Sequence, residues 1–196
     1  KGFHIRPLRG SHLVFPGELF PIKQVLNFIH PKDKRPIFLF PWEGALFLGT
    51  TDTDHKGDIL KEPCITLDEA DYLMTGLANI LPYLKVSGDD CIASIAGVRP
   101  VLSKKKVAAS KESREHVVWK DKGLVTVTGG KLTTFRLLAI DALKAVEKHL
   151  PPPSGPEPRR PGVASVSASN LDACKLSPKA SLRLLGRYGA RASNMT

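Results

Sequence analysis

The segment Gly129–Arg136, GGKLTTFR, stands between two different apolar patterns. The residues before it, Leu124–Thr128, form a short β-branched run that predicts a strand. The residues after it carry an apolar stripe at helical spacing, made of Phe135, Leu138, Ala139, Ala142, Leu143, Val146 and Leu150. Two glycines and two threonines therefore lie where a strand passes into a helix.

This strand-to-helix corner has the chemistry of an anion site. Glycine lets another molecule approach the backbone closely. A helix start offers unpaired N–H groups and a partial positive charge, and Lys131 adds a full charge. The structural alternative is an ordinary strand–loop–helix joint with a threonine N-cap. The corner alone does not decide between the two.

Residues 1–150 have the pattern of an α+β domain. Pro41–Gly44 separates two β-rich runs and predicts a hairpin. Thr66 and Glu69 form a capping box that opens a helix running to about Leu81. The apolar face of this helix is expected to use Ala70, Leu73, Leu77 and Ile80. Strands are predicted near residues 12–15, 37–40, 45–48, 92–96, 116–119 and 124–127. Few helices separate these strands, so we expect a mainly antiparallel sheet with helices on one side.

Residues 151–196 break that pattern. Proline recurs in Pro151–Pro158, which excludes a helix or a central strand and predicts a linker. A last helix is predicted over 179–188, the start of a C-terminal helical region. We expect the whole of 151–196 to be mobile.

The chain has 196 residues, 42% of them apolar, and a net charge of +10. A basic balance is compatible with nucleic acid, anionic lipid or a small anionic substrate. The basic residues are dispersed, with one run of three at Lys104–Lys106, and no zinc-finger spacing or RNA-binding signature occurs. We therefore expect no nucleic-acid partner. The three cysteines are far apart and have no metal-ligand spacing, so no metal site is predicted. No apolar run is long enough to span a membrane, and a first residue other than Met suggests a piece of a longer protein.

Several separated motifs, taken together and in this order, resemble the FAD-dependent glycerol-3-phosphate dehydrogenases, within the D-amino-acid-oxidase-like flavoprotein superfamily. The resemblance covers about residues 3–150. The motifs are RPLRGSHL at 6–13, PWEG at 41–44, LGTTDTD at 48–54 followed by Gly57-Asp58, ASIAGVRP at 93–100, SREH at 113–116 and TGGKLTTFR at 128–136.

The resemblance implies a function for the protein to which the chain belongs. It would oxidise sn-glycerol 3-phosphate to dihydroxyacetone phosphate and pass electrons through FAD to a quinone. Such enzymes bind the cytoplasmic face of the membrane peripherally. The chain has no GxGxxG segment for the ADP half of FAD. Residues 1–150 would thus be the substrate-binding domain with its flavin-contacting strand and helix. We expect the fragment alone to be soluble, inactive, and free of FAD or only weakly bound to it.

The resemblance also assigns roles to individual residues. Arg114 and Lys131 would hold the substrate phosphate, because guanidinium and ammonium groups suit phosphate. Arg99 would face the substrate near the flavin and stabilise alkoxide character as hydride leaves. His12 is the preferred general base among the six histidines because of its Gly-Ser-His context and its ordinary pKa near 6.5. Structural roles remain open for each: an ion pair for Arg99, a surface cation for Arg114, a core contact for His12.

The corner described first would then contact the cofactor. Gly129, Gly130, Leu132, Thr133 and Thr134 would present backbone N–H groups and a helix end to the pyrimidine edge of the flavin. The GTTD motif at 49–52, which ends in Asp52, is interpreted mainly as a turn that Asp52 stabilises.

Two alternatives remain. A glycerol-3-phosphate oxidase would pass its electrons to oxygen, and the phosphate-binding cations do not distinguish that acceptor from a quinone. A non-catalytic anion-binding module would also account for the basic charge.

Overall fold

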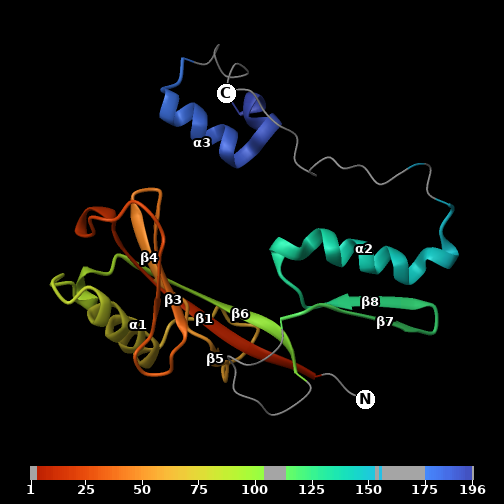
Figure 1. Cartoon of the computed structure of the whole chain (residues 1–196), viewed down its shortest axis with the longest axis horizontal. Helices are drawn as coiled ribbons and strands as arrows, with labels where there is room; N and C mark the ends of the chain where they lie inside the picture. Colours follow the sequence, from red (N-terminus) through yellow and green to blue (C-terminus); the bar gives the residue numbers. More distant parts are fainter. Residues whose placement is uncertain (1–3, 104–113, 153–154, 156–174, 196) are drawn as a thin grey trace. The chain divides into compact units, whose positions relative to one another are not determined.

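Strand β1 (His4–Pro16) is the centre of the main sheet. Along one edge it pairs with β6 (Ala93–Ser103), from His4 to Val14. Along the other edge it pairs first with β5 (Thr53–Asp54) and then with β4 (Ala45–Gly49). Strands β3 (Pro36–Trp42) and β2 (Leu26–Ile29) extend the sheet beyond β4. The two long strands β1 and β6 lie side by side in Figure 1.

The structure is a computed structural model and describes residues 4–103, 114–152, 155 and 175–195. Within these residues every strand pairing is antiparallel. Together with the helices this confirms the α+β class and the mainly antiparallel sheet. The hairpin predicted around Pro41–Gly44 is the β3–β4 connection, with Trp42 paired to Ala45.

Helix α1 (Leu67–Ile80) covers one face of the main sheet. Thr66 and Glu69 form the predicted capping box, because the Thr66 hydroxyl accepts from the Glu69 backbone N–H and the Glu69 carboxylate accepts from the Thr66 backbone N–H. Leu73 and Leu77 of the helix are buried against Leu13 and Phe15 of β1. The remaining buried apolar members of this core are Phe20, Ile37, Leu39, Leu46 and Leu48. Burial of this apolar layer is the main force that holds α1 to the sheet.

A second, two-stranded sheet follows in the chain. Strands β7 (Val117–Asp121) and β8 (Leu124–Thr128) form a hairpin, and helix α2 (Phe135–Val146) packs against both. Figure 1 shows α2 beside this hairpin. A 3₁₀ turn, Leu132–Thr134, precedes the helix, so α2 begins two residues later than the expected Thr133. Short 3₁₀ segments also occur at Gly17–Leu19, Gly88–Asp90 and Glu147–His149.

The chain divides into two compact units, Lys1–Leu150 and Pro151–Thr196. In the second unit, α3 (Pro178–Tyr188) is the helix expected over 179–188, and a 3₁₀ segment, Gly189–Asn194, follows it. Ser177 accepts a hydrogen bond from the N–H of Ala180 and so caps α3. Most of the predicted linker, and Lys104–Lys106, lie outside the described residues.

Candidate functional site

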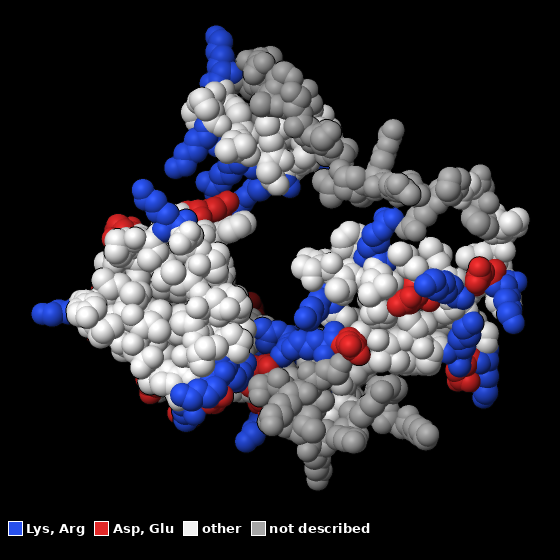
Figure 2. All heavy atoms as spheres, in the orientation of Figure 1, with Lys and Arg blue, Asp and Glu red and all other residues white. Residues whose placement is uncertain are grey.

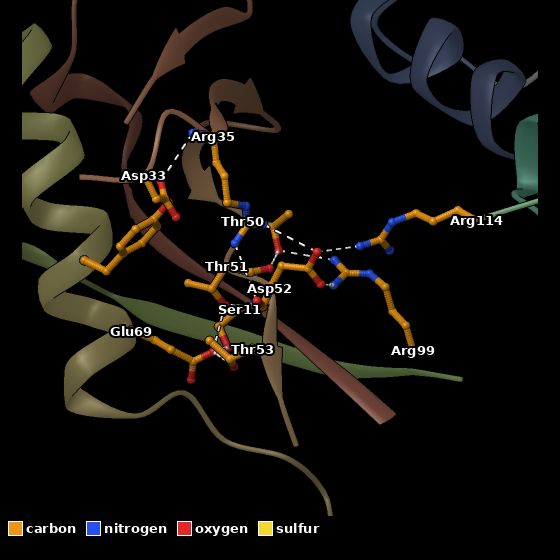
Figure 3. Close-up of polar contacts among 11 residues, drawn as sticks. Ser11, Asp33, Arg35, Thr50, Thr51, Asp52, Thr53, Glu69, Arg99 and Arg114 are labelled. Atoms are coloured by element: carbon orange, nitrogen blue, oxygen red, sulfur yellow. Dashed lines mark hydrogen bonds and ion pairs between the residues drawn. The ribbon is translucent and has the colours of Figure 1, made fainter. Parts of the chain in front are cut away.

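One buried carboxylate is the centre of the candidate site. Asp52 precedes β5, and only 4% of its side chain is exposed. Arg114 donates a 2.6 Å hydrogen bond to its Oδ2 atom. Arg35 and Arg99 approach the same carboxylate at 3.6 Å and 3.7 Å. Figure 3 shows the guanidinium groups of Arg99 and Arg114 directed at Asp52. Three cations around one anion leave an excess of positive charge, which suits an anionic ligand.

Arg99 reaches this cluster from β6 by lying across β1. Its register partner on β1 is Leu8, and its guanidinium lies directly over Gly10, where a Cβ atom would collide with it. The Nη2 atom donates a 3.2 Å hydrogen bond to Thr50 Oγ1. Burial lowers the pKa of Arg99, as does repulsion from Arg114, and Asp52 opposes both effects. An arginine held this way stays charged, and its planar guanidinium keeps a fixed orientation.

A cavity of about 440 Å³ lies between β6 of the main sheet and the segments that flank the β7–β8 hairpin. Its lining includes Arg99 and Arg114 together with Gly129, Gly130 and Lys131. The structure therefore brings together five of the residues to which the sequence assigned roles. Lys131 is exposed, so its ammonium group is accessible to a ligand.

The two glycines of this cavity are required by the backbone. Gly129 and Gly130 have φ angles of +78° and +81°, which residues with a side chain rarely adopt. A Cβ atom on Gly129 would also lie 2.8 Å from the carbonyl oxygen of Glu115. A structural reason for both glycines thus exists beside the expected ligand contact.

The first turn of α2 shows a different use of threonine from the expected N-cap. Thr134 occupies the N-cap position, but its side chain caps nothing in the helix. Its Oγ1 atom instead accepts from the Lys131 N–H and donates to the Lys131 carbonyl. Leu132 is 89% exposed and Thr133 is exposed. These three residues are outside the cavity lining, yet they leave the helix start open to a ligand.

His12 lies on β1 on the same face of the sheet as Gly10 and Arg99. It is half-buried, and its ring fits over Gly49, its register partner on β4. Burial lowers the pKa of His12, and the charge of Arg99 lowers it further. This lowered pKa favours the neutral imidazole, which can accept a proton. It is not part of the cavity lining, although it lies beside the arginine that is.

A second carboxylate supports the loop that carries Asp52. Glu69 of α1 is 3% exposed and accepts hydrogen bonds from Thr51 at 2.7 Å and Thr53 at 3.1 Å. It also accepts from Ser11 at 3.1 Å and pairs with Arg9 at 2.7 Å. Burial would raise the pKa of Glu69, but hydrogen bonds led by that from Thr51 outweigh it and lower the pKa to about 2.

Sequence reasoning missed two participants. Arg35 stands in a charged loop, Lys32–Arg35, that has no distinctive pattern. Glu69 was recognised only as a helix cap. The sequence did contain a signal for Asp52, the GTTD motif, but its interpretation as a turn residue left out the arginines. His116, which is close to Arg114 in sequence, bonds Asp141 of α2 at 2.9 Å and so ties the hairpin to the helix.

The charged side chains are dispersed over the face of the molecule shown in Figure 2, with basic and acidic groups interspersed. Within the described residues, no three His, Cys, Asp or Glu side chains form a group that could hold a metal ion. In the same part of the chain, none of the helices has the length and apolar character needed to cross a bilayer.

Comparison with known proteins gives close relatives. The chain is 37% identical over 150 residues to the aerobic glycerol-3-phosphate dehydrogenase of Bacillus subtilis, which covers 76% of the chain and 27% of the relative. It is 36% identical over 147 residues to the enzyme of the same name from Staphylococcus aureus, covering 74% of the chain and 26% of the relative. No protein-family model matches.

A solved structure agrees with these relatives. The glycerol-3-phosphate dehydrogenase of Bacillus halodurans, complexed with FAD, superposes with a TM-score of 0.63 at 33% identity over 76% of this chain and 28% of that chain. The chain is a homologue of one segment of the aerobic glycerol-3-phosphate dehydrogenases. The family resemblance drawn from the motifs is thereby confirmed. The chain spans about a quarter of the length of the relatives it matches.

Proposed function

We propose that the chain supplies the substrate-binding part of an FAD-dependent glycerol-3-phosphate dehydrogenase, which oxidises sn-glycerol 3-phosphate to dihydroxyacetone phosphate. The observation that carries the proposal is the shared cavity of Arg99, Arg114 and Lys131. Three cations that line one cavity suit a phosphorylated substrate, because a guanidinium can bind a phosphate bidentately and a further cation can stabilise charge that develops at the reacting end. The relatives and the FAD-bound structural neighbour support the same assignment.

Arg114 and Lys131 would bind the phosphate group. Arg114 precedes β7 and Lys131 follows β8, so both reach the cavity from the open end of the hairpin, where Val117 pairs with Thr128, and that pairing limits the spacing between the two cations. Arg99 would lie at the reacting end. Its guanidinium, held by Thr50 and Asp52, would stabilise negative charge that develops on the substrate hydroxyl oxygen.

His12 would accept the hydroxyl proton. Burial, and then the neighbouring positive charge of Arg99, lower the pKa of His12 and so favour the neutral imidazole, which can accept a proton. Because His12 and Arg99 share one face of the sheet, one substrate hydroxyl between them could contact both.

The corner of Gly129 to Thr134 fits a flavin edge. Lys131 and the open first turn of α2 concentrate positive potential there, and the exposed Gly129 and Leu132 leave room for a planar ring. FAD, when bound, would supply the hydride acceptor for oxidation of the substrate's central carbon. The ADP half of FAD would be held by residues other than these 196, which contain no GxGxxG segment. The fragment alone is therefore expected to bind FAD weakly and to be inactive.

The partners of the whole protein are also part of the proposal. We expect electrons to pass to a quinone and the protein to bind peripherally to the cytoplasmic face of the membrane. The net charge of +10 supports attraction to anionic lipid. Formation of hydrogen peroxide instead of reduction of a quinone analogue would favour the oxidase alternative.

The test is an assay of dye reduction by sn-glycerol 3-phosphate with the FAD-bound protein that contains this chain. We expect turnover with sn-glycerol 3-phosphate and a KM at least tenfold higher in Lys131→Ala. Lys120→Ala, an exposed lysine on β7, is the matched control and should leave the KM within twofold. No turnover despite bound FAD would overturn the proposal.

A further inference from the structure

Asp52 is shared by arginines from three separate parts of the chain. Arg35 precedes β3, Arg99 belongs to β6 and Arg114 precedes β7. Their nitrogens lie 3.6, 3.7 and 2.6 Å from the Asp52 carboxylate. Arg35 also donates to the Asp52 backbone carbonyl at 3.5 Å. Among the described residues, these contacts have Asp52 in common.

Without this carboxylate the arginines would repel one another. Repulsion from Arg114 and Arg35 contributes to the lowered pKa of Arg99, after burial, and the Asp52 charge acts in the opposite direction. Asp52 thus offsets part of the cost of placing cations side by side. It neutralises only one of the three charges, so the cluster remains attractive to an anion.

The carboxylate lies behind the cations as seen from solvent. The Arg99 and Arg114 side chains are 35% and 32% exposed, whereas that of Asp52 is 4% exposed. An incoming anion would meet guanidinium groups first and would be separated from Asp52 by them. Arg99 Nη1 is buried and faces Asp52 Oδ1 at 3.7 Å, in an ion pair without a hydrogen bond.

The backbone around Asp52 is fixed on both sides. Thr51 and Thr53 each donate a hydrogen bond to Glu69 of α1. The Thr51 N–H donates to the Ser11 carbonyl of β1 at 3.3 Å. A carboxylate on so constrained a segment can hold flexible arginine side chains in place, rather than follow them.

We infer that Asp52 is a positioning residue that holds Arg99 and Arg114 in one cluster and thereby gives the site its preference for a phosphorylated over a neutral polyol. The inference rests on the proposed function for the identity of the substrate. It replaces the interpretation of Asp52 as a turn residue alone.

The experiment compares Asp52→Asn with Asp54→Asn in the FAD-bound protein that contains this chain. Asp54 is the matched control, since it lies two residues away and pairs with Arg6 at 2.6 Å, outside the cavity. The readout is the ratio of kcat/KM for sn-glycerol 3-phosphate to that for glycerol. We expect this ratio to fall at least tenfold in Asp52→Asn and to change less than twofold in Asp54→Asn. Asp52→Glu keeps the negative charge but moves it by one methylene, so its ratio should lie between those of the wild-type protein and Asp52→Asn.

If Asp52 had a structural role alone, Asp52→Asn would lower kcat/KM equally for sn-glycerol 3-phosphate and for glycerol. The ratio would then be unchanged, and this result would overturn the inference. Tighter binding of the phosphorylated substrate in Asp52→Asn would also overturn it, because Asp52 would then be a competitor for the arginines. If Asp52→Asn does not fold, Asp52→Glu decides, and an unchanged ratio contradicts the inference.

Failure of the proposed function would be visible separately, as wild-type protein that oxidises neither polyol. In that case the affinity for inorganic phosphate, measured by calorimetry, takes the place of the ratio. At least tenfold weaker binding in Asp52→Asn than in Asp54→Asn would support the role of Asp52. Equal affinities would overturn it.

Discussion

Gly10 of β1 and Arg99 of β6 are packed so closely that any side chain at Gly10 would collide with the guanidinium of Arg99. The Arg99 side chain thus packs directly on the Gly10 backbone, and its guanidinium contacts Thr50 and Asp52 from there. Gly97, the register partner of Gly10, has open space where its side chain would be. Two paired glycines therefore have different roles.

Gly10→Ala is expected to displace Arg99 without unfolding the protein, because the colliding atoms belong to the end of a flexible side chain. Arg99 would lose its contacts with Thr50 and Asp52, and kcat/KM for sn-glycerol 3-phosphate should fall about tenfold, a loss of about 1.4 kcal/mol in transition-state stabilisation. Gly97→Ala is the control. Equal kinetics in the two variants would show that the position of Arg99 does not depend on Gly10.

His12 should titrate below its usual value of 6.5, because burial and the Arg99 charge both disfavour the imidazolium form. Arg99→Gln should raise the pKa of His12, whereas Arg99→Lys, which keeps the charge, should leave it closer to the wild-type value. NMR titration of the histidine ring protons measures this directly. A pKa that does not respond to loss of the Arg99 charge would contradict the proximity of the two groups.

Glu69→Gln is expected to destabilise the protein by about 3 kcal/mol, because it leaves the buried guanidinium of Arg9 without its charged partner. Asp68→Asn, an exposed residue of the same helical turn, should cost only about 0.5 kcal/mol. Denaturant unfolding at pH 7 compares the two variants. Similar losses of unfolding free energy in the two variants would mean that the Glu69 contacts contribute little to the stability of the fold.

The same glutamate predicts a pH dependence. Its folded-state pKa of about 2 lies below the unfolded value of 4.5, so the stabilisation is complete above pH 4.5. It is lost progressively as the pH falls from 4.5 towards 2. Glu69→Gln should remove this part of the acid sensitivity, and stability curves for the two proteins should converge in that window. Parallel curves would contradict the prediction.

Gly129→Ala and Gly123→Ala separate backbone strain from collision. Both glycines have positive φ, +78° and +85°, but only Gly129 has a neighbouring carbonyl, that of Glu115, in the way. Gly123→Ala should cost about 1 kcal/mol from strain alone, and Gly129→Ala about 2 kcal/mol or more. Unfolding followed by Trp119 in a Trp42→Phe background reports on this hairpin. A smaller loss for Gly129→Ala would show that the 115–116 segment moves away.

The sequence pattern was sufficient to predict those elements that are determined by a few neighbouring residues. The capping box at Thr66 and Glu69 and the hairpin at Pro41–Gly44 are each encoded within a few residues, and both occur as expected. The N-terminal half of β1 was missed because arginine, proline and glycine in Arg6–Gly10 are poor strand formers. Ion pairs from Arg6 to Asp54 and from Arg9 to Glu69 stabilise that half, and these pairs are not visible in a local window.

The candidate site shows the same division. Motif resemblance singled out Arg99, Arg114 and Lys131, and the fold brings them to one cavity. The relation of Arg35 and Asp52 to them could not be predicted, since it depends on how β3, β5 and β6 are ordered around β1. Charged residues that are far apart in the sequence follow no periodic pattern, so a sequence pattern does not predict that they contact one another in the fold.

Because the Glu69 carboxylate is at once the cap of α1 and the acceptor for Thr51 and Thr53, the loop that holds Asp52 cannot detach while the helix start stays intact. The two segments should open together as one cooperative unit. Native-state hydrogen exchange would then give the amides of the first turn of α1 and of the Thr51–Thr53 loop a common opening free energy. Substitutions that stabilise the first turn of α1 should therefore also slow the opening of the Asp52 loop in the candidate site.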